Sequence, residues 1–143
     1  MNRADDLLKV VQYFESISPD TVGRIGDIYA EDAFFKDPFN EVRGLAAITH
    51  VFRHMFEQVD APRFFVTNSI CQGDDAFITW DFVFRMKRFS TGEQCIRGAS
   101  HLRFAENGRI AAHRDYWDAA EELYEKVPVL GGLMRLLKRA AQS

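Results

Sequence analysis

Residues 76–88, with the sequence AFITWDFVFRMKR, decide the fold of this chain. Large apolar side chains alternate along this run with polar or smaller ones, and Trp80, Phe82 and Phe84 fall on one side. An alternation of period two predicts a strand with one buried face. The three aromatic residues are expected either to line a cavity or to form an exposed patch that marks a dimer interface.

The same period of two continues on both sides of this strand. Three further strands are predicted, at RFFVTNSICQ (63–72), CIRGASHLRFA (95–105) and RIAAHRDYWD (109–118). The sequences STGEQ, which contains Gly92, and ENG at 106–108 are typical of hairpin turns. The second half of the chain is therefore predicted to be a meander of four long antiparallel strands.

The first half of the chain has the apolar spacing of helices. Helices are predicted at residues 2–17, about 20–30 and 44–59. Between the last two, AFFKDP at 33–38 predicts a short strand. Its alternation separates Ala33, Phe35 and Asp37 from Lys36, so we expect the Phe35 and Asp37 face to point inward.

This order of elements predicts the α+β class, because helices and strands are segregated along the chain. A long, curved antiparallel sheet wrapped around N-terminal helices makes a cone-shaped α+β barrel, and its open end can hold a small ligand. Residues 1–120 are predicted to form this domain. Residues 121–143 are predicted to be a helical extension of the same domain that ends in a short basic amphipathic helix.

Length and composition describe an ordinary globular protein. The chain has 143 residues, 47% hydrophobic and 27% charged, which suggests one domain. The net charge of −3 argues against a nucleic-acid partner. The chain contains no apolar run long enough to span a bilayer, and its first residues, MNRADDLL, lack the layout of a signal peptide. We therefore expect a cytoplasmic protein with no membrane partner.

The cysteines and histidines do not form a recognisable metal site. Cys71 and Cys95 lack metal-binding spacing and are expected to be reduced thiols. His50 and His54 lie four residues apart on one predicted helix, but no glutamate follows His50 as in zinc proteases. We expect no metal and no cofactor.

Asp37 raises the question of why an acidic residue ends an apolar run immediately before a proline. Asp-Pro commonly opens a turn, and the carboxylate then bonds to the backbone of that turn. Alternatively, Asp37 faces a cavity, where apolar surroundings make a carboxylate a better base. The sequence by itself leaves both interpretations open.

The last predicted strand carries a second acidic candidate. His113, Asp115 and Trp117 share one face, opposite Arg114 and Tyr116. An Asp–His pair in a cavity is a natural couple for proton transfer. The alternatives are an ion pair at the sheet edge or a dimer surface. Alternation by itself does not decide which face points inward, because Ile110, Ala112 and Tyr116 also make a plausible inner set. Asp81, between Trp80 and Phe82, is expected to point outward.

Several stretches together resemble the nuclear transport factor 2-like superfamily. These are QYFESI, IYAEDAFFKDPF followed by VRGLAAI, and GASHLRFAENGRIAAHRDYWD, in that order. The superfamily includes ketosteroid isomerase, SnoaL-like polyketide cyclases, limonene epoxide hydrolase and scytalone dehydratase. The resemblance covers about residues 5–120, and it implies the cone-shaped fold and a homodimer.

The resemblance also implies site residues. In ketosteroid isomerases a helix-borne tyrosine, an aspartate base in a DP turn and a protonated acid on a strand form the site. Tyr13 and Asp37 match the first two, whereas Ser100 stands at the acid position, where a serine donates a weaker hydrogen bond. Asp115 matches the aspartate that activates water in limonene epoxide hydrolases, and Asp81 the partner aspartate.

The function that we expect is that of a small cofactor-free enzyme of the ketosteroid isomerase or SnoaL-like type. It would move a proton on a hydrophobic small molecule, as an isomerase, a cyclase or an epoxide hydrolase-like enzyme. The expected catalytic residues are Asp37, Tyr13, Asp115 and His113, and the expected substrate-binding residues are Ser100, Trp117, Phe35 and Asp81. The alternative is a non-catalytic binding protein or dimeric adaptor of the same fold.

Overall fold

The computed structural model describes residues 3–87 and 92–122, which form three α-helices, one 3-10 helix and six strands. The helices are α1 (Ala4–Ser16), the 3-10 helix η1 (Val22–Asp27), α2 (Leu45–Gln58) and α3 (Ala119–Glu122). The strands are β1 (Tyr29–Lys36), β2 (Glu41–Arg43), β3 (Val59–Gln72), β4 (Asp75–Met86), β5 (Glu93–Phe104) and β6 (Ile110–Tyr116). The predicted α+β class is confirmed.

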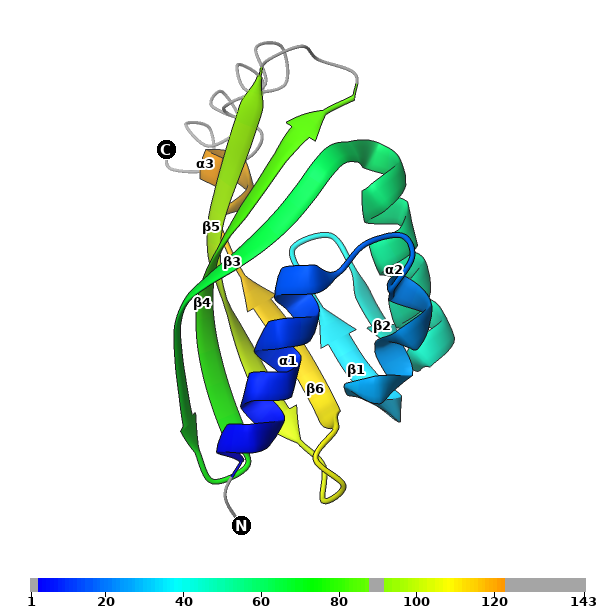
Figure 1. Ribbon diagram of the computed structural model, residues 1–143, viewed down its shortest axis with the longest axis vertical. Helices are drawn as coiled ribbons and strands as arrows, with labels where there is room; N and C mark the ends of the chain where they lie inside the picture. Colours follow the sequence, from blue (N-terminus) through cyan, green and yellow to red (C-terminus); the bar gives the residue numbers. More distant parts are fainter. Residues whose placement is uncertain (1–2, 88–91, 123–143) are drawn as a thin grey trace, which may run out of the picture.

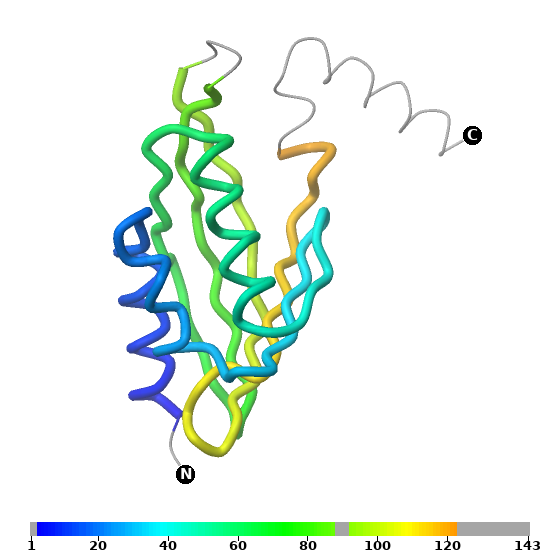
Figure 2. The backbone as a smooth tube through the Cα atoms, turned by 90° about the vertical axis from the view of Figure 1, so that its right-hand side faces the viewer, coloured from blue at the N-terminus to red at the C-terminus, as the bar shows by residue number. Residues whose placement is uncertain are grey.

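The strands form one curved, unclosed sheet with the order β2-β1-β6-β5-β4-β3. Neighbouring strands are antiparallel except for β1 and β6, which run parallel. The sheet bends around α1 and α2, which lie on its concave side (Figure 1). Figure 2 shows β1 and β6 side by side, although they come from opposite ends of the described chain.

The curvature has a local cause in β3. The pairing of β3 with β4 shifts register between Val66 and Asn68, and such a bulge bends a strand and increases its twist. The Val66 amide N–H donates to the Glu15 carboxylate of α1 over 3.0 Å. The helix thus supplies a partner for backbone at the point where the sheet bends.

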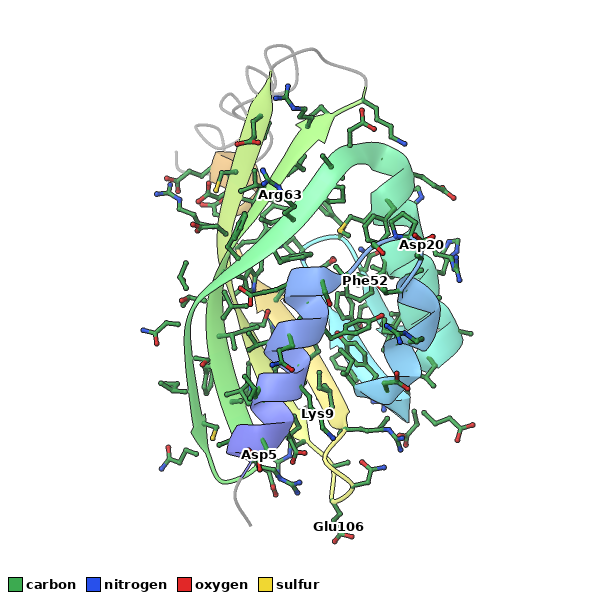
Figure 3. The ribbon with its side chains drawn as sticks, viewed as in Figure 1. Asp5, Lys9, Asp20, Phe52, Arg63 and Glu106 are labelled. Carbon is green, nitrogen blue, oxygen red and sulfur yellow. The ribbon has the colours of Figure 1, made fainter. Side chains whose placement is uncertain are left out.

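The core lies between the concave face of the sheet and the helices. Trp80, Phe82 and Phe84 of β4 are all buried, so these three residues belong to the interior and not to an exposed patch. Phe14 of α1 and Phe52 of α2 are buried opposite them, and Figure 3 marks Phe52 within this layer. The alternation in residues 76–88 therefore arises because one face of β4 packs against the helices.

Two predictions for the first half of the chain are corrected. Residues 20–30 do not form an α-helix, because η1 is a 3-10 helix with a non-helical conformation at Arg24. Gly23 and Gly26 lie within this short segment, and glycine is a poor helix former. The predicted strand at 33–38 is instead β1, which begins at Tyr29 and ends before Asp37.

The structure adds one short strand to those predicted from the sequence. The three-residue strand β2 was not predicted, because it is too short to show a period. Gly92 and Gly108 have positive φ angles of 77° and 82°, a conformation that glycine adopts readily. Most of the predicted C-terminal extension, residues 123–143, lies outside the described residues. In residues 3–87 and 92–122, no helix combines the length and apolarity needed to cross a membrane.

The contact between Gly98 and Trp80 yields a prediction about stability. A Cβ added at Gly98 would lie 2.5 Å from the Trp80 ring, so Gly98→Ala must displace the indole. We expect a cost of about 1–3 kcal/mol in the free energy of unfolding, measured by urea denaturation. Gly23→Ala is the control, because its nearest neighbour is an Arg53 nitrogen at 3.8 Å. Equal stability of the two variants would contradict this packing.

Candidate active site

A small cavity lies between the concave face of the sheet and the two long helices. Its volume is about 20 Å³, which is room for one water molecule. Most of its lining is apolar, and the polar groups come from β4, β5 and β6. The lining residues are Phe14, Phe52, Phe64, Val66, Ile78, Trp80, Ser100, His113 and Asp115.

Strand register brings the polar lining residues together. Ser100 on β5 pairs directly with Asp115 on β6 and with Ile78 on β4. His113 lies two residues before Asp115, so both side chains project from the same face of β6. His113 is buried, Asp115 is partly buried and Arg114 is exposed. The structure therefore selects the inner face that contains His113 and Asp115.

A continuous chain of hydrogen bonds links five side chains at this site. Tyr29 Oη lies 2.6 Å from His113 Nδ1, and His113 Nε2 lies 2.5 Å from Asp115 Oδ1. Ser100 Oγ donates to the same Asp115 oxygen over 2.5 Å. Trp80 Nε1 donates to Ser100 Oγ over 2.8 Å.

The direction of each hydrogen bond follows from the chemistry of its groups. The Trp80 indole only donates, so the Ser100 hydroxyl accepts from it and directs its own proton to Asp115. An ionised carboxylate only accepts, so His113 carries its proton on Nε2. When His113 is neutral, its Nδ1 accepts from the Tyr29 hydroxyl.

Tyr29 is suited to this donor role because it stays protonated. Its side chain is fully buried, and this burial raises the pKa of Tyr29 well above 10. The negative charge of Asp115 raises that pKa further. The Tyr29 ring also stacks on the His113 ring, with centroids 5.9 Å apart and an interplanar angle of 7°.

The two oxygens of Asp115 differ in their surroundings. Oδ1 accepts from both His113 and Ser100, whereas Oδ2 has no hydrogen-bond partner in the described part of the chain. The described residues contain no buried side-chain oxygen or nitrogen that lacks a partner, and the Asp115 side chain is 17% exposed. Oδ2 is therefore accessible at a cavity that is otherwise mostly apolar.

Asp37 and Tyr13 lie elsewhere. Asp37 Oδ1 accepts from the backbone amides of Phe39 and Asn40, at 2.8 and 2.6 Å, and the Asn40 side-chain amide contacts both carboxylate oxygens at 3.1 Å. The Tyr13 hydroxyl donates to the Thr21 carbonyl over 2.8 Å. Partial burial raises the pKa of Tyr13. Neither residue is among those that line the cavity.

The remaining predicted site residues take different positions. Phe35 is buried, and its ring packs edge-to-face against the His113 ring at a centroid distance of 4.8 Å. This contact restricts the orientation of the histidine. Trp117 packs against Phe39 of the Asp37 turn. Asp81 pairs across the sheet with Arg97 and points away from its neighbours Trp80 and Phe82, which face the core.

Tyr29 is the site residue that sequence reasoning missed. It lies in IYAEDAFF, which provided no signal for a polar function because the tyrosine precedes the predicted strand. The parallel pairing of β1 with β6, which was not predicted, brings it to His113 across 84 residues of sequence. Among the described residues, no cluster of three or more His, Cys, Asp or Glu side chains is placed to hold a metal ion.

Tyr29→Phe tests the hydrogen-bond chain. The variant keeps the ring stacking but removes the hydroxyl that donates to His113, so we expect a loss of about 1–3 kcal/mol in the free energy of unfolding. The nitrogen resonance of His113 Nδ1 in an NMR spectrum should also shift. Tyr13→Phe removes a hydroxyl that donates to a backbone carbonyl and should leave that resonance in place. An unchanged Nδ1 resonance in Tyr29→Phe would refute the assigned contact.

Comparisons with known proteins agree with this architecture. A similar structure from Catenulispora acidiphila, a hypothetical protein with a ketosteroid isomerase-like fold in complex with trimethylamine, has 13% identity and a TM-score of 0.74 and covers 87% of this chain and 93% of its own. An LEH-like epoxide hydrolase of M. tuberculosis has 12% identity and a TM-score of 0.68, with coverages of 95% and 96%.

A third structure, described as a SnoaL-like polyketide cyclase of Shewanella denitrificans, has 15% identity and a TM-score of 0.71, and covers 89% of this chain and 97% of its own. At such identities the likeness concerns the fold. No curated protein sequence matches the chain. The family model of the SnoaL-like domain matches residues 10–113, and the chain therefore belongs to the SnoaL-like domain family.

Proposed function

We propose that the protein is a small enzyme that needs no cofactor and uses Asp115 to move a proton on a hydrophobic small molecule. The observation that carries this proposal is the asymmetry of the Asp115 carboxylate. Its Oδ1 is held by two donors, while Oδ2 is accessible at a cavity lined mainly by aromatic and aliphatic side chains. A general base needs a free, oriented lone pair within reach of a ligand proton.

The surrounding residues have separate roles in this proposal. His113 and Ser100 fix the plane of the carboxylate, so that Oδ2 is preorganised before a ligand arrives. Phe14, Phe52 and Phe64 contact the apolar part of the ligand. The cavity of about 20 Å³ holds one water molecule, so a larger ligand enters only when some of these side chains move aside.

The family supports small-molecule chemistry of this kind. Structures similar to this one include proteins described as a polyketide cyclase and an epoxide hydrolase, and one that was solved with trimethylamine. Isomerases, cyclases and hydrolases can all use a carboxylate that accepts a proton. The proposal therefore names the proton transfer and the apolar character of the ligand.

A second candidate function is binding without catalysis. The observation that favours it is Ser100, which stands where the resemblance to ketosteroid isomerase implies an acid, and whose proton is already directed to Asp115. A panel of steroid ketones, hydroxylated aromatic ketones and epoxides separates the two functions. Thermal stabilisation without turnover favours a binding protein, and turnover favours an enzyme.

We also propose that two copies of the chain associate through the outer face of the sheet, in the cytoplasm. Phe77 of β4 is 47% exposed, and it stacks on His101 of β5 with ring centroids 4.4 Å apart. Ile70 of β3 pairs directly with Phe77 and is 64% exposed. Phe65 on β3 and Tyr116 on β6 add exposed aromatic surface. Cys71 is an exposed free thiol, and such a thiol persists in a reducing compartment like the cytoplasm.

The test of the catalytic proposal compares two carboxylates. Asp115→Asn removes the basic oxygen but keeps an amide oxygen that accepts from His113 and Ser100. We expect it to lower turnover of any substrate found in the panel by about 100-fold or more, measured as kcat. A loss confined to Asp37→Asn would instead assign the base to Asp37 and overturn the role of Asp115.

The association has its own test. Phe77→Glu places a charge in the exposed apolar row and should convert a dimer to a monomer in sedimentation equilibrium. Leu8→Glu is the matched control, because Leu8 is 54% exposed on α1, away from the sheet face. A monomeric native protein, or a dimer that persists in Phe77→Glu, would contradict the proposed interface.

A further inference from the structure

We infer that the cavity selects a ligand that presents a hydrogen-bond donor or a positive charge to Asp115, and disfavours a ligand whose polar group only accepts. This inference rests on the proposed role of the cavity as the ligand site. It follows from where every side-chain proton at the site is directed.

In residues 3–87 and 92–122, the side-chain donors that line the cavity are all engaged. Trp80 Nε1–H is donated to Ser100, and the Ser100 hydroxyl proton to Asp115. His113 Nε2–H is donated to Asp115, and the Tyr29 hydroxyl proton to His113 Nδ1. The other lining side chains are phenylalanine, valine and isoleucine, which have no polar hydrogen.

The backbone adds no donor at the one irregular position of the lining. Val66 lies at the bulge of β3, where an amide N–H is commonly left without a ladder partner. Here that N–H donates to Glu15 on α1. The polar atom that remains available to a ligand is therefore Asp115 Oδ2, which is an acceptor.

The negative charge of Asp115 and the aromatic side chains of the cavity also favour a ligand with a positive charge or a hydrogen-bond donor. Among the described residues that line the cavity, Asp115 alone carries a formal charge when His113 is neutral, and none is a lysine or an arginine. Phe14, Phe64 and Trp80 present π-systems, whose faces attract cations. An ammonium or hydroxyl group thus finds both an acceptor and a favourable potential, whereas a carbonyl oxygen meets a carboxylate oxygen.

This arrangement limits the chemistry of the site. Stabilising an enolate requires donors aimed at the developing oxyanion, and none of these side-chain donors is unengaged. Deprotonation of a bound donor, water included, requires only Oδ2. The site is therefore built to accept a proton from its ligand, not to polarise a carbonyl group.

Three compounds with the same six-membered ring test the inference: cyclohexylammonium, cyclohexanol and cyclohexanone. Binding is followed by NMR through the Trp80 indole N–H, which faces the cavity. The chain has two tryptophans, so Trp117→Phe assigns the signal. We expect the ammonium and the alcohol each to bind the native protein at least about tenfold more tightly than the ketone.

Asp115→Asn should reverse this order, because the amide replaces Oδ2 by an N–H donor that a ketone can accept from. Asp32→Asn makes the same change of charge at an exposed site on β1 and should keep the native order. Ketone binding as tight as alcohol binding in the native protein would overturn the inference while leaving the cavity as a ligand site. Native selectivity that survives Asp115→Asn would also overturn it. A Trp80 signal that none of the three compounds perturbs would overturn the proposed ligand site itself.

Discussion

The site depends on two hydrogen bonds that converge on one carboxylate oxygen. His113 and Ser100 both donate to Asp115 Oδ1 over 2.5 Å, and each is in turn fixed by a buried partner, Tyr29 or Trp80. A buried polar network is stable only when its members are satisfied. Here four donors meet their acceptors in sequence, so a charged carboxylate is tolerated beside aromatic rings and keeps one oxygen available.

The same network explains packing choices elsewhere in the fold. The Trp80 indole reaches Ser100 because it lies across Gly98, where any Cβ would collide with the ring. His113 is enclosed by the rings of Phe14, Tyr29 and Phe35, which hold it in one orientation. The large aromatic content of the chain thus serves to immobilise a few polar groups as well as to form the core.

Much of the fold could be predicted from the sequence, because strands that pack one face against helices alternate visibly. The four long strands, α1 and α2 were predicted with ends close to those observed. Alternation placed Phe35 inside and gathered the aromatic residues of β4 on one face, but only the structure shows that this face is buried. The site was predicted less completely. His113, Asp115 and Ser100 were named, but Tyr29 was not, because its role depends on a long-range parallel pairing that leaves no local pattern. Asp37 was named as a site residue, but its carboxylate bonds to the backbone of a turn. The sequence could not distinguish the two roles, because a turn aspartate and a pocket aspartate have the same local pattern.

The parallel pairing of β1 with β6 has a consequence for folding. The Tyr29–His113 contact spans 84 residues, and the loop that it closes contains the whole of α2, β3, β4 and β5. Contacts of such high sequence separation form late, because the entropy of a long loop must be offset by structure already in place. The hydrogen-bond chain around Asp115 is therefore expected to assemble among the last features of the native state, and its spectroscopic signals would report the end of refolding.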